Sequence, residues 1–206
     1  MPTTIPTDAL TTRQKVKDFA GITDTASDTV IDELITGVTM FIKNFCGSRN
    51  FLSASYVDTY DTYRNRHKIF LKQVPVISLT TVEYRSGTPA VPIWNTYDVN
   101  SYLPYLSAGY IHFYGALPQV PQGLRITYTA GYLIDFANEF TSTHTLPADL
   151  TMAASEMCAT MLNTRRSGGI TAEATEGQSV TYDYKHALSD TVANILSNYK
   201  MYRIAP

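Results

Sequence analysis

An excess of one charge, paired cysteines and long apolar runs are all missing from this sequence of 206 residues. The 16 basic and 18 acidic side chains leave a formal net charge of -2, so there is no cationic excess to neutralise a phosphate backbone. Tight, sequence-independent DNA binding is therefore disfavoured. No apolar run approaches the roughly 20 residues that cross a bilayer, and the N-terminus lacks the basic and hydrophobic segments of a signal peptide. We expect a soluble protein, made in the cytoplasm, with no membrane partner.

Catalytic motifs are equally scarce. The sequence contains no nucleophile elbow, phosphate loop or dinucleotide fingerprint. Its histidines lie in different expected elements, without a second histidine or a cysteine at ligand spacing: His67, His112, His144 and His186. Asp183 and His186 are close in sequence, but a carboxylate near a helix N-terminus explains them more simply than an acid–base pair does. We expect no catalytic site, no metal and no cofactor, and therefore no enzyme.

The two cysteines, Cys46 and Cys158, each fall within an expected helix, on or beside its apolar stripe. A thiol in that position behaves as a small buried hydrophobe. We expect two free, buried thiols and no disulfide.

Helical patterns occupy both ends of the chain. Residues 1–11, with two prolines and four threonines, predict an extended N-terminal arm. Thr12 can cap a short helix that ends at Gly21. A longer helix is expected from Ser27 to Cys46, with one apolar face formed by Val30, Ile31, Leu34, Ile35, Val38, Phe41, Ile42 and Phe45. Gly37 inside it indicates either a close helix crossing or simple tolerance of a glycine.

Two further helices follow in the last third of the chain. Pro147 suits the first position of a third long helix, which closes on Arg165 and Arg166. Residues 170–184 are polar and predict a long loop that can form a hairpin. A last helix is expected from His186 to Tyr202.

Between the helical ends, residues 50–134 are rich in tyrosine, valine and threonine, and prolines and glycines interrupt them regularly. Expected strands cover 56–63, 68–74, 77–85, 110–114 and 124–129. The fold class is therefore α+β: a helical bundle of three long helices and a short N-terminal one, with an inserted antiparallel β-sheet or small open barrel. We expect an arm (1–11), a helical domain (12–49 and 135–206) and a β-rich lobe (50–134).

The chain contains 15 tyrosines, and two interpretations of them stay open. Tyrosine combines a large contact area with a polar tip and is enriched at protein interfaces, which favours an oligomer interface. Ordinary half-buried strand tyrosines would give the same count. The basic residues Arg64, Arg66, His67 and Lys68 lie near Tyr60 and Tyr63, a pattern that can grip single-stranded nucleic acid. A hairpin tip with solvated charges explains the same residues better, because of the strand alternation around them.

The order of several marks along the chain resembles a known family. These marks are the short helix after Leu10-Thr11, the striped helix ending Phe45-Cys46-Gly47, the strand phrase Ile126–Tyr132, and the helix from Leu146-Pro147 to Arg165-Arg166. Together they resemble the head-tail connector, or adaptor, proteins of long-tailed bacteriophages, the gp6-like and gp15-like group.

This resemblance implies a structural virion protein whose copies form a ring, usually dodecameric, under the portal protein. The ring would extend the channel for double-stranded DNA without tight or specific binding, and would dock the next neck or tail component, a stopper or tail-terminator protein. The resemblance also places the C-terminal segment at the portal, here Tyr199, Lys200, Met201, Tyr202, Arg203 and Ile204. Glu173 and Glu176, on a glycine-flanked loop, then either face the channel or are simply solvated.

Two other functions remain open from the sequence. In a β-sheet binding module, the lobe would recognise a glycan or other surface ligand, although the single tryptophan, Trp94, gives little of the usual stacking platform. An enzyme would need a pocket with convergent ionisable groups, and the sequence offers no candidate set.

Overall fold

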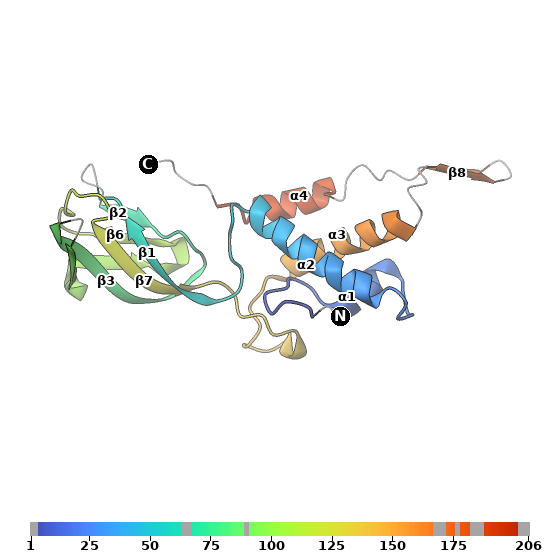
Figure 1. The fold of residues 1–206 in the computed structure, drawn as a ribbon, viewed down its shortest axis with the longest axis horizontal. Helices are drawn as coiled ribbons and strands as arrows, with labels where there is room; N and C mark the ends of the chain where they lie inside the picture. The colour runs from blue at the N-terminus through green and yellow to red at the C-terminus, as the bar shows by residue number, and fades with distance from the viewer. Residues whose placement is uncertain are drawn as a thin grey trace. The chain divides into compact units, whose positions relative to one another are not determined.

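The computed structural model describes residues 4–62, 67–88, 91–166, 172–175, 178–181 and 188–201. The chain divides into two compact units (Figure 1). The helical unit comprises Met1–Phe51 and Ile134–Pro206, and the β unit comprises Leu52–Leu133. None of the described helices combines the length and apolarity needed to cross a membrane.

Helix α1 (Arg13–Ala20) begins and ends where the sequence predicts. The Thr12 side-chain oxygen accepts a hydrogen bond from the Lys15 N–H at 3.3 Å. Gly21 ends the helix in the left-handed conformation, with φ of 65°. Helix α2 (Asp28–Phe45) follows, within one residue of its expected bounds at each end.

A charged network joins α1 to α2. Asp32 on α2 is almost fully buried and accepts two hydrogen bonds from Arg13, at 2.9 and 2.5 Å. Arg13 also reaches Asp28 at 3.2 Å, and the buried Lys17 pairs with the same carboxylate. Buried charges persist only when they are paired and hydrogen-bonded, so this network fixes how the two helices meet.

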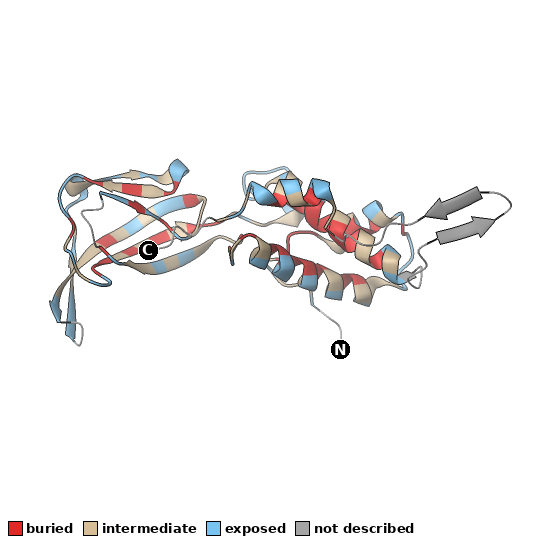
Figure 2. Cartoon of the chain, turned by 90° about the horizontal axis from the view of Figure 1, so that it is seen from above, coloured by how far each residue is buried: buried red, intermediate tan, exposed pale blue. Residues whose placement is uncertain are grey.

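Helix α3 (Ala148–Arg166) contacts α1, α2 and the last helix, α4 (Asp190–Ser197). Its buried side chains are mostly small, which lets neighbouring helices approach closely: Leu150, Ala153, Ala154, Met157, Cys158, Ala159 and Leu162. Figure 2 shows the buried residues of the helical unit on the inner sides of its helices. Strands β8 (Ala172–Thr175) and β9 (Gln178–Thr181) form an antiparallel pair. This hairpin lies earlier in the chain than the expected one around Ser179 to Tyr184, of which residues 182–184 lie outside the described residues.

The last helix is shorter than expected. It starts after Ser189, whose side chain accepts a hydrogen bond from the Val192 N–H at 3.1 Å, and ends at Ser197. The expected start at His186 and end at Tyr202 lie outside the described residues. Tyr199 and its neighbours leave the helix because other parts of the helical unit bind them, as described below.

The segment before α1 lies against the helical unit. Leu10 is fully buried, and its N–H donates to Thr39 on α2 at 3.3 Å. The hydroxyls of Thr11 and Ser155 lie 2.6 Å apart, and Asp8 pairs with Lys43. Residues 8–11 therefore pack against the helical unit.

The β unit contains two antiparallel sheets, of four and three strands. The first has the order β1-β7-β3-β4 and the second the order β2-β6-β5. The strands are β1 (Ala54–Tyr60), β2 (Lys68–Phe70), β3 (Val76–Thr88), β4 (Val91–Thr96), β5 (Tyr102–Tyr105), β6 (Tyr110–Phe113) and β7 (Leu124–Ala130). Short 3-10 helices cover Val99–Ser101 and Leu106–Ala108, and one in the helical unit covers Phe136–Asn138. Among the described residues neither sheet closes into a barrel.

Strands β4 and β5 were not predicted. Each contains a proline, Pro92 or Pro104, and each is an edge strand of its sheet, where a missing N–H costs no ladder bond. The expected strand from Lys68 also stops early, at Phe70, because the chain bends over residues 72–75.

One core lies between the inner faces of the two sheets. On β7 the inward residues alternate strictly with half-exposed ones. The buried cluster consists only of residues of the β unit: Ile69, Leu71, Val76, Val82, Ile111, Phe113, Leu117, Leu124, Ile126, Tyr128 and Ala130. The core of this unit therefore rests on aromatic and β-branched side chains.

Candidate functional site

The described part of the predicted portal-binding segment is bound to the helical unit. The Tyr199 hydroxyl donates to Asp149 on α3 at 2.7 Å. The Lys200 ammonium lies 4.2 Å from the ring centroid of Phe45, a cation–π contact. The Met201 N–H donates to a backbone carbonyl just after α2, at 3.1 Å. The segment thus returns to the end of α2. The other predicted residues, Tyr202, Arg203 and Ile204, lie outside the described residues.

Of the two predicted channel residues, Glu173 lies on β8, where its backbone pairs with Val180 on β9. Glu176 lies outside the described residues. Arg64, Arg66 and the neighbouring Tyr63 lie outside them as well, so the structure describes only the last two residues of the basic run, His67 and Lys68.

The described parts of the chain bring together no catalytic or metal-binding group. No cluster of three or more histidine, cysteine or acidic side chains suited to a metal occurs there. Both cysteines are free and buried, as expected. Burial raises the pKa of the Cys158 thiol to about 12, and burial also raises the pKa of the Cys46 thiol. Neither thiol is therefore ionised at neutral pH, as a nucleophile would require.

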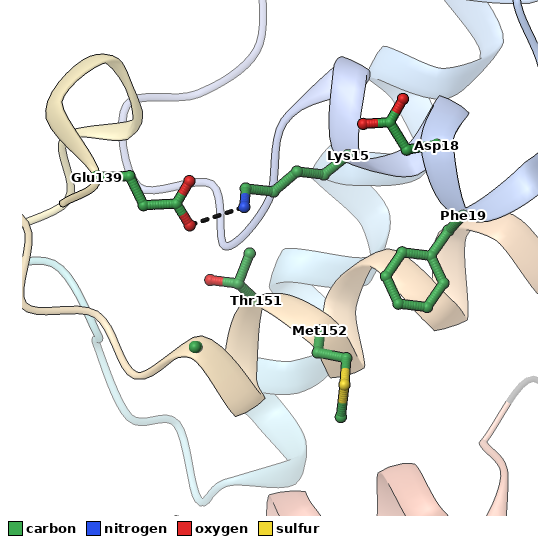
Figure 3. Close-up of a pocket in the computed structure, with 7 residues that line it drawn as sticks. Lys15, Asp18, Phe19, Glu139, Thr151 and Met152 are labelled. Carbon is green, nitrogen blue, oxygen red and sulfur yellow. Dashed lines mark hydrogen bonds and ion pairs between the residues drawn. The ribbon is translucent and has the colours of Figure 1, made fainter.

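A shallow pocket of about 220 Å³ lies where α1 meets α3 in the helical unit. Figure 3 shows Lys15 and Glu139 joined at one side of it and the apolar side chains of Phe19 and Met152 at another. The ion pair spans 2.7 Å. Phe19 and Met152 are 51% and 42% exposed. We call this surface the α1–α3 patch. Its single ion pair is already closed, so it suits a contact surface better than a reaction.

A second exposed apolar surface lies on α2. At 3.6 residues per turn, the buried face of the helix is centred on Ile35 and Ile42, and a second row runs beside it. We call this row the α2 outer stripe: Val30, Leu34, Gly37, Phe41 and Phe45. Phe41 is 41% exposed and its ring lies 6.0 Å from that of Phe45. Gly37 is exposed, and no described atom lies within 4 Å of the position that a Cβ would take. A close crossing within the chain is therefore excluded for the described residues, although the glycine costs about 1 kcal/mol relative to alanine.

A third apolar surface is the outer face of the three-stranded sheet. Strand register places alternate residues on it together, with Tyr114 just beyond β6. We call it the aromatic face: Phe70, Leu103, Tyr105, Tyr110, His112 and Tyr114. Its rings contact one another, with centroids 4.8 Å apart for Tyr105 and Tyr110 and 5.8 Å apart for His112 and Tyr114. Tyr114 is 61% exposed and Phe70 is 53% exposed.

The structure divides the tyrosines between the interior of the β unit and its surface. Tyr128 is fully buried, and its hydroxyl donates to Asp58 at 2.7 Å. Tyr105 and Tyr114 lie on an exposed surface instead. The sequence analysis missed the aromatic face because it depends on β5, an unpredicted strand. The sequence over 102–105, Tyr-Leu-Pro-Tyr, does not alternate between apolar and polar residues, so it gave no signal for this strand.

The comparisons with known proteins point to one family. A family model described as "HCP: Head completion protein" matches residues 9–202. No curated protein matches the chain at a significant level.

Solved structures give a consistent fold. A chain in the neck of an empty gene transfer agent (GTA) particle, computed with C6 symmetry, matches with a TM-score of 0.56 and 16% identity, over 98% of this chain and 95% of that one. A chain in the virion of a native GTA particle matches with a TM-score of 0.55 and 19% identity, over 98% and 95%. A chain in the neck of a native GTA particle, computed with C12 symmetry, gives 0.54 and 19%, over 98% and 94%. At these identities the similarity shows a shared fold. Because the family model spans nearly the whole sequence, the chain belongs to the head completion protein family.

Proposed function

We propose that the chain is a head-tail adaptor of a virion neck, a structural subunit that forms a ring under the portal, extends the DNA channel and docks the next neck or tail component. The observation that carries this proposal is the family match over residues 9–202. It covers both units, so the whole chain takes part in the role.

The surfaces of the described chain support a ring of copies. A ring is built from a heterologous contact, in which each subunit offers two different surfaces. The helical unit has two such surfaces, the α2 outer stripe and the α1–α3 patch. The similar neck structures were computed with C6 and C12 symmetry, which fits a ring of six or twelve copies; we assign twelve here.

For the portal contact we assign Tyr199, Lys200, Met201, Tyr202, Arg203 and Ile204. The start of this segment is anchored to the helical unit, because Tyr199 and Met201 are hydrogen-bonded to it. A segment that starts from a fixed point loses less conformational freedom on binding than a free tail does.

For the channel we assign Glu173 and Glu176. Each phosphate that a protein neutralises strengthens DNA binding through counterion release. Carboxylates at the lumen make no such contact, so they let DNA slide. The net charge of -2 agrees with a conduit of this kind.

The aromatic face favours a second candidate function, a β-sheet module that binds a glycan or another surface ligand. Exposed aromatic rings on one face are the observation that favours it. In the adaptor the same face is available to the next neck component.

One experiment separates the two functions. Purified full-length chain is mixed with portal rings of the same virus and imaged by electron microscopy, beside a chain that lacks residues 202–206. The adaptor gives a stacked collar on the portal with the full chain and fewer or no collars with the truncated one. The binding module predicts a different result: monomers persist beside bare portals, the chain is retained on a glycan array, and Tyr105→Ala abolishes that retention. These results together would contradict the adaptor and support the binding module.

A further inference from the structure

Helix α2 carries more apolar surface than the described fold uses. Ile31, Ile35 and Ile42 are fully buried on the side that packs within the helical unit. The α2 outer stripe continues the apolar surface around the helix at spacings of four, three, four and four residues. That spacing matches the seam along which one helix packs against another.

Gly37 lies in the middle of this stripe, with open space above it. The distance between two packed helices depends on the side chains at their contact. A glycine flanked by Leu34 and Phe41 therefore leaves a notch that a protruding side chain of another helix can enter. The described residues of the chain leave that notch unfilled.

The α1–α3 patch carries protruding apolar side chains of the kind that can fill the notch. Phe19 and Met152 project from two adjacent helices and are about half exposed. Methionine adapts its shape to irregular gaps, and phenylalanine contributes a large apolar area. The two surfaces differ in residues and lie on different helices, as a heterologous contact requires.

We propose that a second copy of this chain packs on the α2 outer stripe, with Phe19 and Met152 of that copy seated over Gly37. This rests on the ring of the proposed function and names the contact that closes it. A second copy is the occupant because the helical unit itself carries both halves of the contact. When one heterologous contact is repeated about a rotation axis, the copies form a ring.

The test blocks each half separately. Gly37→Trp fills the notch and leaves the α1–α3 patch intact. Met152→Glu places a charge in the patch and leaves the α2 outer stripe intact. Oligomeric state is measured by native mass spectrometry and sedimentation velocity, for each variant alone and on portal rings. Gly37→Ala and Thr29→Trp are the matched controls, the first small and the second equally bulky at an exposed position of α2 off the stripe.

Each blocked variant alone is expected to lose at least nine-tenths of its rings, while both controls keep them. An equimolar mixture of Gly37→Trp and Met152→Glu is expected to give heterodimers and no rings, because one good surface remains on each chain and the two are complementary. If Met152→Glu alone forms dimers, the stripe binds another stripe and the proposal is overturned.

Two further outcomes are decisive. If Gly37→Trp lowers the melting temperature of the monomer and leaves ring formation intact, the chain itself, for example residues 202–206, covers the stripe, and the inference fails while the adaptor stands. If the unmodified chain forms no ring either alone or on portals, the proposed function itself fails.

Discussion

The two units of the chain bury polar groups in different ways. In the helical unit, two carboxylates and two cations form a network between α1 and α2, centred on Asp32. In the β unit, neutral hydroxyls of Tyr60 and Tyr128 surround one carboxylate, Asp58, which also pairs with Lys72 on the surface. The helical unit is thus fixed by opposite charges and the β unit by neutral donors.

This difference follows from what each unit packs. Helix α3 presents small side chains, so the helices approach closely and long cations from α1 can span to α2. The sheets instead enclose rings such as Phe113 and Tyr128, whose bulk keeps water and counterions out. A polar group there must be satisfied by a neighbour within the core. The two units should therefore respond differently to mutation and to pH.

The largest expected effect tests whether the two cores are separate. Ile126→Ala in the β unit and Ile35→Ala in the helical unit each remove a fully buried side chain, and each should cost about 3 kcal/mol of unfolding free energy. Urea unfolding is followed by two signals. The fluorescence of Trp94, the single tryptophan of the chain, reports on the β unit, and circular dichroism at 222 nm reports mainly on the helices. Ile126→Ala should shift the Trp94 transition more, and Ile35→Ala the circular-dichroism transition more. Equal shifts of both signals by both variants would mean that the units unfold as one.

The sequence was most informative about the helices because their signals are local. Thr12 and Gly21 are a cap and a stop that act within one turn, and both ends of α1 lie where these residues predict. Strands β4 and β5 depend on pairing with distant strands, and their prolines argued against them. Edge position, which made those prolines acceptable, is a property of the folded sheet and is absent from any local pattern.

The interaction surfaces were harder still to predict. Periodicity placed Leu34 and Phe41 in the same stripe as Ile35 and Ile42, because all of them lie within one broad arc of α2. Only the packed fold shows that Ile35 and Ile42 are fully buried, whereas Leu34 is half-buried and Phe41 is exposed. The sequence likewise could not distinguish the buried Tyr128 from the exposed Tyr114, because strand register decides which face of the sheet each tyrosine lies on.

The next effect tests the charged network of the helical unit. Asp32→Ala removes both hydrogen bonds from Arg13 and leaves Lys17 and Arg13 to share Asp28. Bonds to charged groups contribute roughly 1.5 to 3 kcal/mol, and Arg13 is partly exposed, so we expect a loss of about 2 kcal/mol by circular dichroism. The control is Glu33→Ala, the next residue on the exposed side of α2, which should cost less than about 0.5 kcal/mol. Equal losses for the two variants would show that the network contributes no specific stability.

A smaller effect, specific to the β unit, is expected at alkaline pH. Burial raises the pKa of Tyr60 and of Tyr128 above the ordinary value of about 10. Because each tyrosine has a higher pKa in the folded state than in the unfolded state, its contribution to the unfolding free energy is complete below about pH 10. That contribution is lost as the pH rises toward the folded pKa. Each tyrosine should then lower the unfolding free energy by about 1.4 kcal/mol per pH unit.

The measurement is the urea midpoint of Trp94 fluorescence at pH 9, 10 and 11. Tyr128→Phe should be less stable than the unmodified chain at pH 9, because it removes the hydrogen bond that the Tyr128 hydroxyl donates to Asp58. Between pH 10 and 11, however, its stability should fall less steeply, because Tyr128 no longer contributes while the other tyrosines whose pKa values are raised by burial still do: Tyr60, Tyr97 and Tyr102. An unchanged slope would mean that the alkaline loss arises from other groups.

The smallest effect concerns an ion pair on the outer face of the four-stranded sheet. Arg125 donates to both carboxylate oxygens of Glu83, at 2.7 and 2.9 Å, and its guanidinium lies 4.4 Å from the ring centroid of Trp94. Arg125 holds the pKa of Glu83 below its ordinary value. Because the folded pKa is the lower one, the contribution is present above about pH 4.3 and is lost as the pH falls through the folded value.

Glu83→Gln should therefore cost only about 0.5 kcal/mol at pH 7, as exposed ion pairs do, and it should alter Trp94 fluorescence because the guanidinium is less firmly held over the ring. The difference in urea midpoint between variant and unmodified chain should stay constant from pH 7 to 5 and shrink as the pH falls from about 4.3 through the folded pKa. Thr81→Ala on the same face serves as the control, since it removes no charge and its difference should not depend on pH. If the Glu83→Gln difference does not shrink in acid, packing of the Glu83 side chain rather than its charge stabilises this face. The charge of Glu83 would then contribute nothing to the stability of the β unit that these two variants can detect.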